Sequence, residues 1–263
     1  MAATTRDTSK SLFLFATALL IIMGVLAFIF DVRKPVPDWW NIYLIWIFVI
    51  VLITAIVATI GKMKNGKVLG IAIDGRNKYS LSRLQMTFWT ILVIATIYTF
   101  TLWNLGFSAT PMNFVVPPVL WALMGISSIS LVGSPLILNN KPASVVVKNA
   151  SPVSAQWTDL IAGEENGNRQ TVDLARVQML LITIVVGVSY TIMIAMVLAR
   201  AKASATVIAA TENKVAAATA AAKAMGASTT DATILSFPEM SAGIIALLTI
   251  SHAGYLTYKA VKK

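Results

Sequence analysis

Few side chains in this 263-residue sequence could perform chemistry. It contains no cysteine, which excludes disulfides, thiolate metal sites and cysteine nucleophiles. Its single histidine, His252, precedes Tyr255 by three residues and Lys259 by seven, so the three side chains share one face of a helix. There His252 could gate a pore by protonation, bind a cofactor, or form a hydrogen bond inside a helix bundle, and we favour the hydrogen bond.

Glu164 and Glu165 are adjacent carboxylates that could bind a cation. They lack the further acidic residues of a calcium loop, so we expect both on a solvated surface. The sequence also lacks the phosphate-binding P-loop, the dinucleotide glycine motif, the zinc-protease motif and the nucleophile elbow. We therefore predict a non-enzymatic protein with no catalytic residue, metal ion or cofactor. An enzyme acting on lipid is the least favoured function.

An internal repeat contains a paired motif. Residues 76–93 match residues 169–186, with eight of eighteen positions identical, and both copies contain an Arg-x-Gln-Met sequence. Each Arg would begin a helix in the inner headgroup layer, with its Gln two residues deeper. These residues could form a pore mouth or docking surface, but we favour a lipid anchor whose Gln bonds to a neighbouring helix. The four candidate residues for a lipid anchor or pore mouth are Arg83, Gln85, Arg176 and Gln178.

Hydroxyl groups are the main polar groups inside the apolar segments. They fall on single faces of two predicted helices, where they could line a narrow hydrated path or pack against other helices, and we favour packing. No charged residue lies inside an apolar segment, which disfavours ion-coupled transport. The candidate pore-lining residues are Thr87, Thr90, Thr101, Ser127, Ser130 and His252.

The elements that must position these residues are apolar. Hydrophobic residues make up 57% of the chain and charged residues 12%, about half the charged share of a typical soluble domain. A helix needs roughly 20 apolar residues to cross the hydrocarbon core of a membrane. We therefore predict an all-α, six-span transmembrane helix bundle. The spans are residues 12–30, 42–60, 86–107, 115–138, 177–198 and 240–258.

The net charge of +10 indicates topology rather than a nucleic-acid partner. If the N-terminus is cytoplasmic, 15 of the 21 Lys and Arg residues fall in cytoplasmic segments, as the positive-inside rule requires. No basic patch with interleaved aromatic residues accompanies them, so we predict no nucleic-acid binding. We expect both termini in the cytoplasm and contact with membrane lipids, including anionic headgroups.

The repeat predicts three hairpins. Residues 1–61 form an N-terminal two-span hairpin, residues 62–138 the first repeat hairpin with a basic cytoplasmic loop, and residues 139–263 the second repeat hairpin. Both motif copies begin spans from the same side, which predicts a parallel duplication of the helical hairpin. In the cytoplasmic loop 139–172, a β-like run at 144–147 precedes an amphipathic piece. Its Trp157, Leu160 and Ile161 are expected to pack on the inner membrane face.

The external insertion, residues 200–237, is rich in alanine. Eleven of residues 201–223 are Ala, the best helix former, so span five could continue outward as one helix to about Met225. A thin apolar stripe on that helix would pack in a homo-oligomer, whereas the alternative is a flexible linker. The candidate oligomer contacts are Ile208, Val215 and Ala222.

The repeated motifs resemble those of a group of uncharacterised bacterial multi-pass inner-membrane proteins. The resemblance covers roughly residues 74–263 and implies a location in the bacterial inner (plasma) membrane. It implies no activity. The motifs are S-L-S-R-L-Q-M at 80–86, A-L-M-G-I-S at 122–127, D-L-A-R-V-Q-M at 173–179, and the segment 238–259.

The sequence favours a non-enzymatic, homo-oligomeric pore or channel for ions or small solutes. The hydroxyl faces, the absence of coupling charges and the self-packing insertion motivate this hypothesis. The alternative is a membrane anchor or scaffold subunit of a larger membrane-associated machine, with an unknown protein partner. The basic cytoplasmic loops and the repeated Arg motif motivate the alternative.

Overall fold

The computed structural model describes residues 2–29, 42–105, 110–140, 142, 146–165, 170–215 and 235–261. This part of the chain is all-helical, as predicted, with three isolated β-bridges and no strand among the described residues. The α-helices are α1 (Ala2–Ile29), α2 (Ile42–Asn65), α3 (Leu81–Asn104), α4 (Pro118–Asn139), α5 (Leu174–Val215) and α7 (Ala242–Val261). Three short 3-10 helices are η1 (Gly70–Ala72), η2 (Pro152–Ser154) and η3 (Trp157–Leu160).

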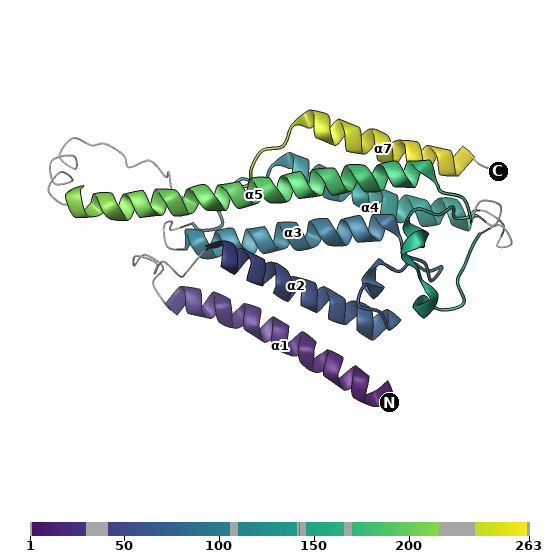
Figure 1. Ribbon diagram of the computed structural model, residues 1–263, viewed down its shortest axis with the longest axis horizontal. Helices are drawn as coiled ribbons and strands as arrows, with labels where there is room; N and C mark the ends of the chain where they lie inside the picture. Colours follow the sequence, from purple (N-terminus) through teal and green to yellow (C-terminus); the bar gives the residue numbers. More distant parts are fainter. Residues whose placement is uncertain are drawn as a thin grey trace.

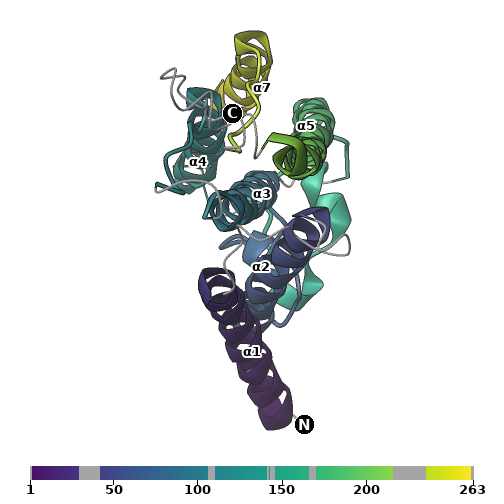
Figure 2. The ribbon, with the colours of Figure 1, turned by 90° about the vertical axis from the view of Figure 1, so that its left-hand side faces the viewer.

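The α-helices lie side by side along the long axis of the molecule (Figure 1). Both ends of the chain lie at the same end of this bundle, together with the segments that follow α2 and α4. We call residues 66–80, 146–165 and 170–173 the cap, and the end where they lie the cap end. Helices α3 and α5 start at the cap end, and α4 and α7 return to it. Viewed along the bundle, α3 lies in the middle (Figure 2).

Four helices of the described part are long and apolar enough to cross a membrane. They are α2, α3, α4 and the apolar part of α5, up to Arg200. In α4, for example, Ile129, Val132 and Leu136 are exposed at i, i+3 and i+7, as lipid contact requires. The count is lower than the six predicted spans, because the described apolar part of α1 is short and α7 contains several polar residues. The structure therefore supports a helical membrane protein with four candidate spans.

The interior of the bundle is packed with aromatic and aliphatic side chains. Trp89 of α3 lies against Tyr190 of α5, with ring centroids 6.3 Å apart, and the indole nitrogen of Trp46 donates to the Thr96 hydroxyl at 3.1 Å. At the end opposite the cap, Phe237 packs on Phe100 at 5.2 Å between centroids. These contacts close that end of the bundle core with large apolar groups.

The cap has a small hydrophobic cluster of its own. Tyr79 stacks on Trp157 with ring centroids 5.4 Å apart, and Leu160 is buried beneath them against the helices. The predicted packing of this segment on the membrane therefore does not hold for Leu160, because its partners are protein side chains. Val146 of the β-like run forms one isolated bridge, with Glu165.

Helix α5 continues past the apolar part without interruption to Val215, in agreement with the predicted outward helix up to that residue. The C-terminal part of α5 extends beyond the rest of the bundle (Figure 1). Ile208 and Val215 lie in α5 after its apolar part, but their side chains, like the whole of Ala222, lie outside the described part of the chain. Their role as oligomer contacts stays a prediction.

Gly70 is required where η1 meets the end of α2. A Cβ atom on Gly70 would lie 2.2 Å from the carbonyl oxygen of Gly61, whereas a Cβ on Gly75 would meet nothing within 4 Å. We expect Gly70→Ala to lower the unfolding free energy in detergent by roughly 1–3 kcal/mol, because backbone atoms must move apart. Gly75→Ala is the matched control and should leave thermal unfolding unchanged. Equal melting temperatures for the two variants would refute the close approach.

Candidate functional site

The candidate site is an ion cluster centred on Glu164 at the cap end. One carboxylate oxygen, Oε1, lies 2.7 Å from Nη2 of Arg76 and 3.8 Å from Nη1 of Arg176. The other oxygen, Oε2, pairs with Nζ of Lys259 and accepts a hydrogen bond of 3.3 Å from the Tyr255 hydroxyl. Lys259 also donates to the Ser134 hydroxyl. The cluster thus joins the cap to α4, α5 and α7.

Local structure positions Arg76, Glu164 and Arg176. Asp74 accepts hydrogen bonds from both Nε and Nη2 of Arg76, at 2.9 and 2.6 Å, and so orients the guanidinium toward Glu164. The Glu164 carbonyl accepts from the Val147 amide at 3.0 Å, which ties its backbone to a neighbouring segment of the cap. Asp173 caps α5, since its Oδ1 accepts from the amides of Ala175 and Arg176 at 3.1 and 3.4 Å.

Burial makes the charges of this cluster interdependent. Desolvation alone would raise the pKa of Glu164, but Lys259, Arg176 and Arg76 outweigh it and hold that pKa below its ordinary range. Glu164 is therefore ionised. A buried carboxylate costs several kcal/mol to desolvate unless cations and hydrogen-bond donors surround it, which is the arrangement here.

A second ion pair supports the cap beside the cluster. Lys78 lies 3.5 Å from Asp159, and both side chains are buried. Burial lowers the pKa of Lys78, and the charge of Asp159 offsets part of that effect. Asp159 also accepts from the backbone amides of Gln156 and Tyr79 at 2.9 and 3.4 Å, so it links η3 to the segment before α3.

The positions of Glu164 and Arg176 differ from the sequence-based expectations. Glu164 was expected on a solvated surface and is 7% exposed, while Arg176 was expected among lipid headgroups and is 2% exposed. Arg176 donates instead to the Ala162 carbonyl at 2.7 Å. The reason is that Arg76 and Lys259, 88 and 95 residues away along the chain, are brought to Glu164 by folding. The only sequence feature that pointed to this cluster was the shared helical face of His252, Tyr255 and Lys259, all of which are buried.

A hydrogen-bond network lies one to two turns deeper in the bundle. Nε2 of Gln85 donates to the Thr183 hydroxyl at 2.5 Å, and its Oε1 lies 3.1 Å from Nε2 of His252. Nδ1 of His252 lies 2.9 Å from the Leu248 carbonyl. His252 thus makes a hydrogen bond inside the bundle, the role that we favoured. Gln85 bonds to neighbouring helices α5 and α7.

The two copies of the Arg-x-Gln-Met motif occupy different environments. Gln85 and Arg176 are buried, Arg83 is half-buried and Gln178 is exposed. Arg176 belongs to the Glu164 cluster and Gln85 to the His252 network, so the structure does not bring the four residues into one equivalent set. The difference follows from position, because α3 is central and α5 exposes more of its surface.

The remaining pore-lining candidates are spread over the bundle. Thr87 and Thr101 donate to carbonyls of their own helix, at 2.8 Å each, and Thr90 is half-buried. Ser127 and Ser130 are buried on α4. Among the described residues, no group of three His, Cys, Asp or Glu side chains could hold a metal ion. The Glu164 cluster fastens the cap to α4, α5 and α7.

Comparisons with known protein families, curated proteins and solved structures find no match to this chain.

Replacing Glu164 should destabilise the protein strongly. Glu164→Gln leaves the buried Arg176 and Lys259 and the half-buried Arg76 without their shared anion, and we expect it to lower the unfolding free energy in detergent by about 3–5 kcal/mol. Glu239→Gln is the matched control, since Glu239 is exposed at the opposite end. Adding Lys259→Met to Glu164→Gln should recover part of the loss. Thermal unfolding of the four proteins measures these effects.

The effect of Glu164→Gln on thermal stability should depend on pH. Because the pKa of Glu164 is lowered in the folded state, its contribution to stability is present above the ordinary carboxyl value of 4.5 and is lost as the pH falls below that value. The gap in melting temperature between wild type and Glu164→Gln should therefore narrow on acidification. A gap that stays constant with pH would contradict an ionised Glu164.

The two copies of the repeat provide a matched pair of variants that tests the hydrogen-bond network around Gln85. Gln85→Leu removes hydrogen bonds to Thr183 and His252, and we expect a loss of about 1–2 kcal/mol in unfolding free energy. Gln178→Leu, the equivalent change in the other copy, alters an exposed side chain and should have little effect. Denaturation monitored by circular dichroism compares the two. Equal losses would show that the motif acts in the same way in both copies.

Proposed function

We propose that this protein is a non-enzymatic membrane anchor or scaffold subunit of a larger membrane-associated assembly. The observation that supports it most is the Glu164 cluster, in which cations from the cap, α5 and α7 share one buried carboxylate. Such a cluster holds a folded cap rigidly on the end of a helix bundle. At the opposite end the α5 extension projects past the bundle, so structured surfaces are available at both ends.

The topology that we propose has six spans, with α1 and α7 crossing the membrane beside the four candidate spans. Both ends of the chain lie at the cap end, as an even number of spans requires. We place this end in the cytoplasm, following the distribution of Lys and Arg. The bacterial inner membrane and the duplicated hairpin are parts of the same proposal, based on the repeated motifs.

The homo-oligomeric pore stays a prediction. Thr87 and Thr101 donate within their own helix, and His252 within the bundle, so these groups are already satisfied inside one chain. Phe100, Phe114 and Phe237 pack together at the end opposite the cap. A conducting path along Thr87, Thr101 or His252 would have to compete with these contacts.

Reconstitution and native electrophoresis distinguish the two functions. For a scaffold, purified protein in vesicles should give no ion conductance or solute flux. In mildly solubilised native membranes, the chain should migrate in a complex larger than its own oligomer. Glu164→Gln should release it from that complex, because the cap is no longer held, whereas Glu239→Gln should not. Conductance by the purified protein, with no larger complex, would overturn the scaffold and support the pore.

A further inference from the structure

The end of α2 and the cap form an exposed surface that combines lysines with apolar side chains. We call it the lysine–tryptophan surface, and it consists of Lys62, Lys64, Val68, Val153 and Trp157. Val68, Val153 and Trp157 are 58%, 64% and 60% exposed, whereas Ile73, Tyr79, Val147 and Leu160 of the cap are buried. Lys62 and Lys64, in the last turn of α2, are also exposed.

Contacts between the segments make this surface continuous. A Cβ on Gly66 would lie 3.7 Å from Cγ2 of Val153, so the end of α2 touches the segment of η2. Nζ of Lys67 donates to the Ala155 carbonyl at 2.5 Å and lies 5.6 Å from the centre of the Tyr79 ring, which in turn stacks on Trp157. Trp157 is thus held in place from below while one side of its ring stays exposed.

Lys62 and Lys64 give this surface positive charge, while three carboxylates of the cap are paired with cations inside it. Asp74 and Glu164 pair with Arg76, and Asp159 pairs with Lys78. These carboxylates therefore do not offset Lys62 and Lys64. A positive surface with an exposed indole complements a layer of negative headgroups, in which tryptophan is the preferred aromatic residue.

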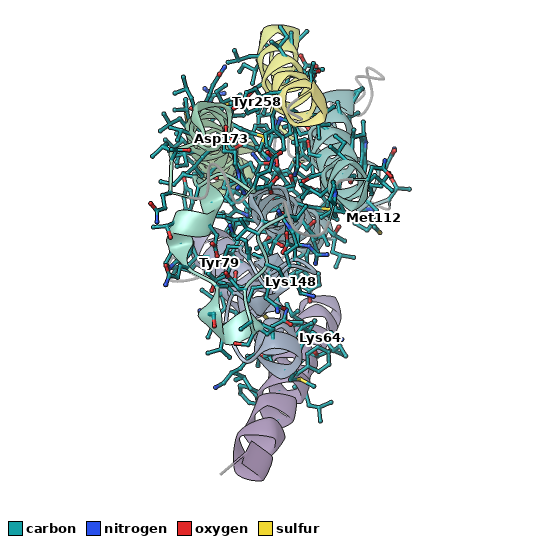
Figure 3. The ribbon with its side chains drawn as sticks, turned by 90° about the vertical axis from the view of Figure 1, so that its right-hand side faces the viewer. Lys64, Tyr79, Met112, Lys148, Asp173 and Tyr258 are labelled. Atoms are coloured by element: carbon teal, nitrogen blue, oxygen red, sulfur yellow. The ribbon has the colours of Figure 1, made fainter. Side chains whose placement is uncertain are left out.

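The position of the surface favours a membrane over a soluble partner. Lys62 and Lys64 end an apolar helix that is long enough to cross a membrane, so they lie at the level of the headgroups. Seen along the bundle, the cap lies on the flank of α2 and α5 rather than across the bundle axis (Figure 2). Seen along the bundle from the cap end, Lys64 lies below Tyr79 and Lys148 (Figure 3). Lipid headgroups would surround a segment in this position.

We infer that the lysine–tryptophan surface binds anionic phospholipid headgroups in the leaflet at the cap end. The lysines supply electrostatic attraction, worth about fivefold in affinity for each residue near the surface. Val153 and Trp157 enter the interface between headgroups and acyl chains. This contact fixes the cap on the membrane plane and is independent of the proposed scaffold function.

The absence of native cysteine allows a direct test on the full chain. A fluorophore on Val153→Cys reports contact at the surface, and one on Ser236→Cys, an exposed position at the opposite end, is the control. The labelled proteins are reconstituted in vesicles of phosphatidylcholine alone or mixed with phosphatidylglycerol. Quenching is measured with acrylamide, which is neutral, and with a quencher attached to the lipid headgroup.

Anionic lipid should protect the label at 153 from acrylamide, expose it to the lipid-attached quencher, and leave the label at 236 unchanged. Lys62→Gln with Lys64→Gln should reverse the protection, while the charge-preserving change of both to Arg should keep it. Equal quenching at 153 in the two kinds of vesicle would overturn the proposal. Protection found only in native membranes would also overturn it and would indicate a protein partner.

Discussion

Glu164 is a carboxylate removed from water, and the position of the cap depends on the cations around it. Removing one partner of a buried ion pair leaves an uncompensated charge, so Arg76, Arg176 and Lys259 must all stay close to it. These residues come from the segment before α3, the start of α5 and the end of α7. Their shared partner therefore restricts the relative positions of elements that are far apart in the sequence.

Helix α7 illustrates how polar contacts position a helix of mixed composition. It is held at two levels, by Lys259 in the Glu164 cluster and by His252 beside Gln85. In a low-dielectric interior these groups are costly when unpaired, so their partners determine the rotation and axial position of α7 against α4 and α5. Apolar packing has no such directionality, and it fills the space that remains.

The two Arg-x-Gln-Met segments show that similar sequences need not perform similar tasks. Both begin helices at the cap end, and Asp173 caps the second as its residue type predicts. The central place of α3 buries Gln85, whereas α5 leaves Gln178 exposed and directs Arg176 into the ion cluster. Local sequence thus sets where each helix starts, and the neighbouring helices set what its side chains contact.

The sequence by itself determined the helical class, the approximate limits of the apolar helices and the shared face of His252, Tyr255 and Lys259. These features depend on local hydropathy and helical periodicity, which are properties of contiguous residues. Only the tertiary structure decided that Glu164 is buried and that Arg176 binds protein rather than lipid. Glu164 looks like a surface residue until folding brings cations from 88 and 95 residues away, and no local pattern encodes that encounter.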